Sequence, residues 1–316
     1  MRRPLSAVLA LILAALALTG CRPIVRDAPQ RLSVYATFYP IYALTEAVLR
    51  DIPDAELHCL VQPQDGCLRN YNLSDWDAAL LARGADAVMM GGRGLERFES
   101  ALFGWGDGGP AMCALLYNLE LYSDGTKAAE EGESHLKGPN PHLYMSMSGA
   151  QQMLDSAAAM MVSLDPRYAA QYSENAQSAK AGLQAAYDAA RALLSDCEGR
   201  RVILMNEALV YCARDYGLVI ADQVERESGD ALTGEALEKL IERLKHDEAD
   251  IVLIERQAPQ ALVEALESAN LTVAKLDVMS THTENEGFDV YLQIQSDNAR
   301  AMREAFDRAV AGKDKA

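Results

Sequence analysis

Polar and ionisable residues stand among apolar neighbours at four places where an expected strand gives way to a loop. These places are Gly66–Tyr71, Asn140–Tyr144, Asn206–Glu207 and Asp277. Side chains at the carboxyl ends of parallel strands line the crevice in which α/β proteins bind their ligands. The sequence contains no HExxH or GxSxG motif and no clear nucleophile–base pair, so nothing indicates hydrolytic chemistry. We therefore expect these residues to bind a ligand.

Two series of alternating β and α segments are expected to position these residues. In the first series, we expect strands at 34–38, 56–61, 87–90 and 112–116, and helices at 41–50, 74–83 and 95–103. In the second, we expect strands at 202–205, 218–224, 250–255 and 273–276, and helices around 211–214 and at 236–246, 258–269 and 288–310. Such alternation predicts parallel sheets with helices on both faces.

The stretch between the two series is rich in Ala, Gln, Met and Leu, and Pro166 divides it. This composition predicts one helix before Pro166 and a long helix of about 27 residues after it, spanning roughly 40 Å. The long helix is either one arm of a hairpin packed on one domain or a connector between two. We favour the connector, and thus an α/β fold of two Rossmann-like lobes, 32–147 and 199–316, joined by a helical segment, 148–198, with the ligand cleft between them.

The first residues have the features of a secretory signal. Arg2 and Arg3 precede an apolar run at 7–18, which is shorter than the ~20 residues of a spanning helix. Leu18 to Cys21 resembles the lipobox of bacterial lipoproteins, which implies cleavage before Cys21, acylation of its sulfur and anchoring to the outer side of the bacterial cell membrane. Residues 1–20 are then a signal peptide and 21–31 a tether. An ordinary signal peptide with a coincidental cysteine is the alternative.

Composition limits the class of partner. Removal of residues 1–20 takes away two arginines and no acid, so the formal net charge of −17 becomes −19. So acidic a surface disfavours nucleic acid and anionic lipid as partners and raises the local concentration of cations. The remaining residues suit two domains of ordinary size. Cys59 and Cys67 are close enough in sequence to form a disulfide, but spacing alone cannot establish one. The sequence contains no CxxC motif, which disfavours a cysteine-rich zinc site.

Several short motifs occur together in a characteristic order. They are Phe38-Tyr39-Pro40, Val61-Gln62-Pro63, Tyr71 with Ser74, Asn140-Pro141-His142-Leu143-Tyr144, Tyr211 with Tyr216-Gly217, and the strand-ending Glu255 and Asp277. In this order the chain resembles, from about residue 32 to 310, the zinc/manganese-type substrate-binding proteins of bacterial ABC importers. The resemblance implies a monomeric, non-enzymatic protein without an organic cofactor. It implies that Zn²⁺ or Mn²⁺ is bound between the lobes as a transported ligand and delivered to an ABC permease and its ATPase.

The resemblance also implies that one histidine or carboxylate from each of four positions holds the ion. His142 matches the second position and Asp277 the fourth. At the first position, before the retained Tyr71, this chain has Arg69, and at the third it has Asn206 with Glu207 next to it. Arginine stays protonated and offers only N–H donors, so Arg69 cannot ligate a cation.

Three outcomes follow from these departures. In the first, Arg69 swings away, and His142, Asp277 and Glu207 hold the metal together with water, Asn206, Cys67 or His58. In the second, Arg69 pairs with Asp277 or Glu207, and no metal binds. In the third, the cleft takes an anion or a metal chelate that Arg69 clamps. His282, shortly after Asp277, either lines the mouth of the cleft or lies in a surface loop.

Two other classes of protein remain as alternatives. One is a metal-assisted hydrolase that uses His142, Asp277 and Glu207. The other is a tethered adhesion or scaffold protein whose cleft is vestigial.

Overall fold

The computed structural model describes residues 31–62, 68, 71–102, 109–123, 139–224 and 232–313. Leu32–Ala316 form one compact unit. The expected signal peptide, Cys21 and the tether up to residue 30 lie outside the described residues.

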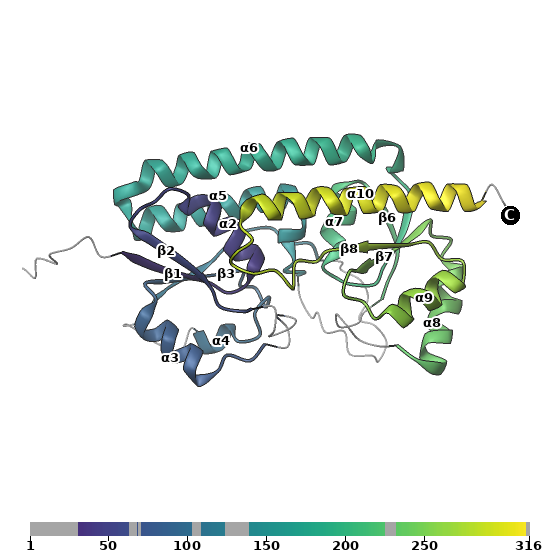
Figure 1. Ribbon diagram of the computed structural model, residues 1–316, viewed down its shortest axis with the longest axis horizontal. Coiled ribbons are helices and arrows are strands. Elements are labelled where there is room, and N and C mark those ends of the chain that lie inside the picture. The colour runs from purple at the N-terminus through teal and green to yellow at the C-terminus, as the bar shows by residue number, and fades with distance from the viewer. Residues whose placement is uncertain are drawn as a thin grey trace, which may run out of the picture. The chain divides into compact units, whose positions relative to one another are not determined.

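The first four strands form a parallel sheet in the order β2-β1-β3-β4. This sheet and its helices are called the N-terminal lobe. Every residue of β3 is buried, as expected for a parallel strand covered on both faces, and Figure 1 shows α3 and α4 on the opposite side of the sheet from α2. The elements are β1 (Leu32–Ala36), α2 (Tyr39–Leu49), β2 (Ala55–Cys59), α3 (Asp75–Gly84), β3 (Ala87–Met90), α4 (Glu99–Leu102) and β4 (Ala111–Ala114).

The last four strands form a second parallel sheet, in the order β6-β5-β7-β8. This sheet and its helices are called the C-terminal lobe. The strand β7 is entirely buried, like β3 in the first sheet. The elements are β5 (Arg201–Leu204), α7 (Leu209–Asp215), β6 (Val219–Gln223), α8 (Gly234–His246), β7 (Ile251–Glu255), α9 (Gln260–Ser268) and β8 (Val273–Leu276).

The two sheets have the same topology, which confirms the predicted fold class. In each, the second strand of the chain lies at one edge, and the first and third strands are neighbours in the middle. The order of connection therefore reverses between β1 and β3 and between β5 and β7. Ligands of open α/β sheets bind beyond the carboxyl ends of strands at such a point.

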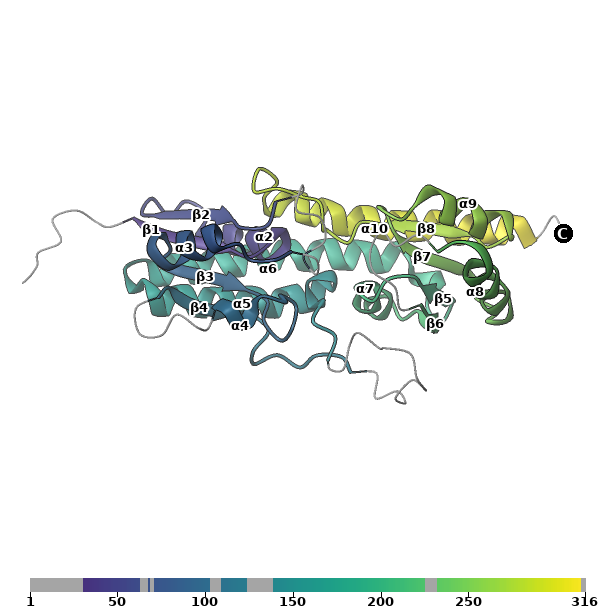
Figure 2. The same ribbon diagram turned by 90° about the horizontal axis from the view of Figure 1, so that it is seen from below.

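Helices connect the lobes and pack against both. After η4 (Leu143–Met145) come α5 (Met147–Leu164), η5 (Pro166–Tyr168), α6 (Ala169–Leu193) and η6 (Ser195–Cys197), and α10 (Phe288–Lys313) ends the described chain. The predicted break at Pro166 is confirmed. The 25 residues of α6 span about 38 Å, and α6 packs on α5, α2 and α10. Figures 1 and 2 show α6 and α10 side by side. The finer domain limits stay a prediction.

The helix predicted at 95–103 is wrong for most of its length, since the structure forms only the short α4 there. The cause is Glu96, whose buried carboxylate accepts hydrogen bonds from the N–H groups of Gly91 and Gly92, both at 2.8 Å, and from the Thr37 hydroxyl at 2.7 Å. These bonds tie residue 96 to the preceding turn, where Gly92 has a positive φ of 75°. The glycine-rich turn that begins at Gly91 thus binds the carboxylate of Glu96 in the same chain.

Among the described helices, none combines the length and the apolar composition needed to cross a membrane.

Candidate functional site

His142 lies beside Glu207, where the two lobes meet. Its Nδ1 is 2.9 Å from Asn140 Oδ1, and the same oxygen accepts the His142 backbone N–H at 3.0 Å. Because that oxygen is an acceptor, Nδ1 carries the proton in the neutral ring, and Nε2 is then the nitrogen with the lone pair. Nε2 lies 3.9 Å from Glu207 Oε1, and both side chains are less than one-fifth exposed.

Asn140 also fastens the two lobes to each other. Its Nδ2 donates to the Glu207 carbonyl at 2.9 Å, and its own carbonyl accepts the Tyr211 hydroxyl at 2.7 Å. The Tyr211 oxygen in turn accepts the Tyr122 N–H at 2.9 Å. Asn140 is 5% exposed, so water competes little for these bonds. One buried carboxamide therefore orients both His142 and the backbone of Glu207.

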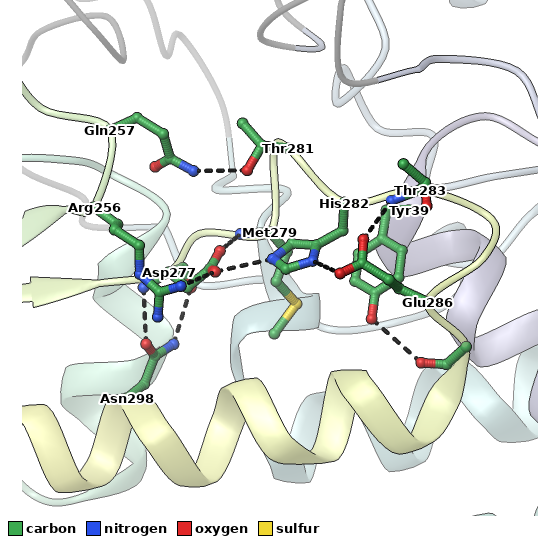
Figure 3. Close-up of polar contacts among 11 residues, drawn as sticks. Tyr39, Arg256, Gln257, Asp277, Met279, Thr281, His282, Thr283, Glu286 and Asn298 are labelled. Atoms are coloured by element: carbon green, nitrogen blue, oxygen red, sulfur yellow. Dashed lines mark hydrogen bonds and ion pairs between the residues drawn. The ribbon is translucent and has the colours of Figure 1, made fainter.

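Asp277 is buried at the end of β8 and faces two cationic side chains (Figure 3). Its Oδ2 lies 2.9 Å from His282 Nε2 and 3.2 Å from Arg256 Nη1. Its Oδ1 accepts the Met279 N–H at 2.7 Å. Asn298, on α10, accepts from the Asp277 N–H and donates to its carbonyl. Main-chain and side-chain bonds thus fix this carboxylate.

His282 lies between two carboxylates, as Figure 3 shows. Its Nδ1 is 3.1 Å from Glu286 Oε1, and its ring contacts the ring of Tyr39 at 4.9 Å between centroids. The other Glu286 oxygen accepts the Thr283 N–H at 2.9 Å. Tyr39 belongs to the N-terminal lobe, so His282 also lies where the lobes meet. His282 lies in the loop between β8 and α10, as one of the two expectations had it, but its side chain is only 14% exposed.

The charges in this group shift one another's pKa values. The hydrogen bond to Asp277 raises the pKa of His282, against the effect of burial, and Glu286 raises it further. Burial opposes ionisation of Asp277, but the hydrogen bonds from His282 and the Met279 N–H, with the charge of Arg256, outweigh it and lower the pKa of this carboxyl. Burial also opposes ionisation of Glu286, but the hydrogen bonds from the Thr283 N–H and from His282 outweigh it and lower the pKa of this carboxyl. The group therefore favours an ionised form.

The other predicted site residues have different surroundings. Asn206 Oδ1 accepts the Ala208 N–H at 2.9 Å, which shapes the turn into α7. Tyr71 donates to Asp77 Oδ2 at 2.9 Å and packs on Phe98. His58 lies on the edge strand β2 with its side chain 36% exposed, and its Nε2 is 3.7 Å from Glu56 Oε1, so it is not a buried core histidine. Arg69 and Cys67 lie outside the described residues, so whether Cys59 and Cys67 form a disulfide is untested.

The structure thus assembles two histidine–carboxylate pairs, His142–Glu207 and His282–Asp277. Within the described part of the chain, no three His, Cys, Asp or Glu side chains are grouped so that they could hold a metal ion together. The pairs nevertheless lie at one edge of the C-terminal sheet, because Glu207 follows β5 and Asp277 follows β8, with β7 between them. Two strand spacings separate these strand ends by about 10 Å.

Sequence reasoning selected the segment that begins with Asn140 but missed two other residues that shape these pairs, Arg256 and Glu286. The turn at Asn140 is a common local one, in which an Asn side chain accepts the N–H two residues on. Arg256 follows β7 directly, so the strand-end rule that selected Asp277 could have found it. Glu286 had no such signal, because its contact with His282 depends on the conformation of the loop between β8 and α10.

Comparisons with known proteins agree with this architecture. The high-affinity zinc uptake system protein ZnuA of Bacillus subtilis is 23% identical over 290 residues, covering 87% of this chain and 88% of its own. The SBP FpvC of Pseudomonas aeruginosa, solved in complex with Mn²⁺, superposes with a TM-score of 0.75 at 22% identity, over 88% of this chain and 99% of its own.

The Zn(II)-bound ZnuA-like domain of Streptococcus pneumoniae AdcA superposes with a TM-score of 0.72 at 21% identity, over 88% of this chain and 99% of its own. At these identities the two superpositions establish a shared fold. The family described as the periplasmic zinc-uptake complex component A (ZnuA) matches residues 34–305. That match spans both lobes and both histidine–carboxylate pairs, and the chain therefore belongs to the ZnuA family.

Proposed function

We propose that this protein captures a divalent metal ion outside the cytoplasm and delivers it to an ABC permease and its ATPase. The ion is cargo, zinc in preference to manganese, and His142, Glu207 and Asp277 hold it where the lobes meet. Membership in the ZnuA family and the two α/β lobes support this function over a metal-assisted hydrolase or a scaffold with a vestigial cleft.

The main support for the proposal is the orientation of the His142 ring. Metal-binding histidines usually donate the second ring N–H to a carbonyl or carboxylate, which fixes the tautomer and aims the other nitrogen at the ion. His142 has this arrangement, with Asn140 Oδ1 as the acceptor and Glu207 Oε1 3.9 Å from Nε2. Imidazole nitrogen with carboxylate oxygen suits zinc and also accommodates manganese.

The expected anchor and the net charge fit the same function. A lipid on Cys21 keeps the protein at the membrane beside its permease, and the chain binds its cargo as a monomer. The acidic surface concentrates cations near the cleft and gives no footprint for nucleic acid.

Zinc titration of the purified protein tests the proposal. We expect about one zinc ion per chain, and His142→Ala weakens its affinity by about 100-fold or more, since loss of an outer-shell partner alone typically costs 10- to 100-fold. His246→Ala is the matched control, because His246 ends α8 at the surface, and it leaves the affinity unchanged. The measurement is competition against a chromophoric zinc chelator, repeated with manganese.

Two results would contradict the function. One is a wild-type protein that binds neither zinc nor manganese while melting cooperatively. The other is unaltered affinity in His142→Ala.

A further inference from the structure

We propose that His282 is a ligand of the cargo ion, acting together with Asp277, and that Glu286 is the positioning residue for its ring. This inference rests on the proposed function and names a residue outside the four positions that the family resemblance implies. It gives the cleft a second imidazole, in a chain that has Arg69 and Asn206 at two of those positions.

The distance between His282 and Asp277 suits a shared ion. Nε2 and Oδ2 are 2.9 Å apart. Two neighbouring ligands with bonds of about 2.0–2.1 Å to a tetrahedral zinc lie about 3.3 Å from each other. A small separation of these two atoms therefore makes room for a metal ion bound to both, beside the line that joins them.

The other side of the ring already has the partner that a metal-binding histidine requires. Glu286 Oε1 lies 3.1 Å from Nδ1, so Nδ1 keeps its proton and donates there, and Nε2, which faces Asp277, is the nitrogen that can exchange its proton for an ion. A carboxylate that accepts the second N–H of a histidine fixes its tautomer and makes it a more basic ligand. Glu286 is itself held by the Thr283 N–H, so the ring is oriented before an ion arrives.

Contacts from three separate elements fix this half of the site. The Tyr39 ring at the start of α2 packs on the His282 ring, and Asn298 of α10 binds both backbone groups of Asp277. Arg256, following β7, is the competing cation at Oδ2. An ion that binds here must displace Arg256 from that oxygen, and the 56% exposure of the Arg256 side chain leaves it room to move.

Contacts between aromatic rings link the surroundings of His282 to those of the His142–Glu207 pair. Tyr144 packs on His142 at 5.9 Å and on Phe38 at 5.4 Å. The residue after Phe38 is Tyr39, which packs on His282 at 4.9 Å. Both imidazoles therefore border the segment that follows β1. Each pair supplies an imidazole and a carboxylate, the two kinds of ligand that zinc accepts.

The experiment counts imidazoles on the bound metal. Zinc K-edge X-ray absorption of the zinc-loaded protein is expected to show two imidazoles in the wild type and one in His282→Gln. The same variant weakens zinc binding by about 10-fold or more, measured by chelator competition. His246→Gln is the matched control and changes neither quantity.

Glu286→Gln is the second variant, and it keeps the His282 ring in place. As a positioning change it weakens zinc binding by about 10-fold, while the absorption spectrum still shows two imidazoles. Melting curves of the zinc-free proteins establish that each variant is folded.

The outcomes separate the two proposals. If His142→Ala abolishes tight binding but His282→Gln keeps both the wild-type affinity and the wild-type imidazole count, His282 is not a ligand and the proposed function stands. If the wild-type protein binds neither zinc nor manganese, both proposals are wrong.

Discussion

At the scale of single residues, the main feature of the cleft is that Asp277 is already balanced by cations. Arg256 and His282 both contact its Oδ2, and its pKa is lowered accordingly, against the effect of burial. In the proposed site, a metal ion would therefore exchange with these side chains and would not enter a bare anionic site. The affinity for the ion depends on how strongly those cations compete.

Arg256→Gln is expected to strengthen zinc binding. The substitution removes the Arg256 charge, which lies 3.2 Å from Asp277 Oδ2 and competes with the ion for that oxygen. Because the Arg256 side chain is half exposed, we expect its loss to change the free energy of zinc binding by about 1 kcal/mol, or about five-fold in affinity. The gain decreases as salt is added, because exposed charges are screened. Chelator competition at low and at high ionic strength measures it. Unchanged affinity at low salt would show that Arg256 does not oppose the ion.

At the scale of elements, the turn between α5 and α6 is fixed by a charged group. Asp165 accepts hydrogen bonds from Arg167 Nε and Nη2, both at 2.8 Å, and from the Arg167 N–H at 3.2 Å. Arg167 also contacts Asp54, in the N-terminal lobe. The hydrogen bonds from Arg167 lower the pKa of Asp165, against the effect of burial. This turn thus depends on an ionised carboxylate for its stability.

Asp165→Asn is expected to lower the melting temperature at neutral pH and to have less effect in acid. Because the folded-state pKa of Asp165 lies below its ordinary value of 3.8, its contribution to stability is present above pH 3.8 and is lost as the pH falls through the folded-state pKa. Melting curves of both proteins at a series of pH values measure the difference. Glu174→Gln, on the exposed face of α6, is the control. A difference that persisted undiminished in acid would contradict the charge-based explanation.

Regular elements with a clear hydrophobic pattern were predictable from the sequence. The strands at 87–90 and 273–276 have the predicted bounds, because buried parallel strands are continuous apolar runs. The helix predicted at 95–103 failed because the pattern does not show that Glu96 bonds back to the turn before it.

The site was less predictable than the fold. Strand ends led to the segments that contain His142, Glu207 and Asp277, and the family resemblance singled these residues out within them. The place of His282 depends on Tyr39, on Asn298 and on the loop before α10, which lie far apart in sequence. Spacing along the chain carries no information about such contacts.

At the scale of the whole molecule, buried polar contacts fasten the lobes together. Asp215, at the end of α7, accepts from the Ser146 hydroxyl at 2.9 Å and from the Met147 N–H at 2.8 Å, where α5 begins. Together with Tyr211 and Asn140, these bonds join the C-terminal lobe to the segment that carries His142. The two lobes thus belong to one compact unit, Leu32–Ala316.

Cys21→Ser is expected to release the protein from the membrane. The serine oxygen cannot replace the cysteine sulfur in lipidation, so the variant appears in the soluble extracytoplasmic fraction and incorporates no labelled fatty acid. Cys59→Ser is the control, since Cys59 is buried in β2 and stays unmodified. Membrane association of the wild type without any fatty-acid label would contradict the lipid anchor.

The helix α10 binds both halves of the proposed ligand set. Tyr291 and Gln295 donate to the carbonyl of Tyr144, two residues after His142, and Asn298 holds the backbone of Asp277. Residues 291 and 298 are two helical turns apart, about 10.5 Å along the axis. One helix thus contacts the backbone beside both histidine–carboxylate pairs. Inserting one residue between positions 291 and 298 would turn these contacts by about 100° relative to each other, so the relative placement of the two pairs depends on residue spacing within α10 as well as on the loops that carry them.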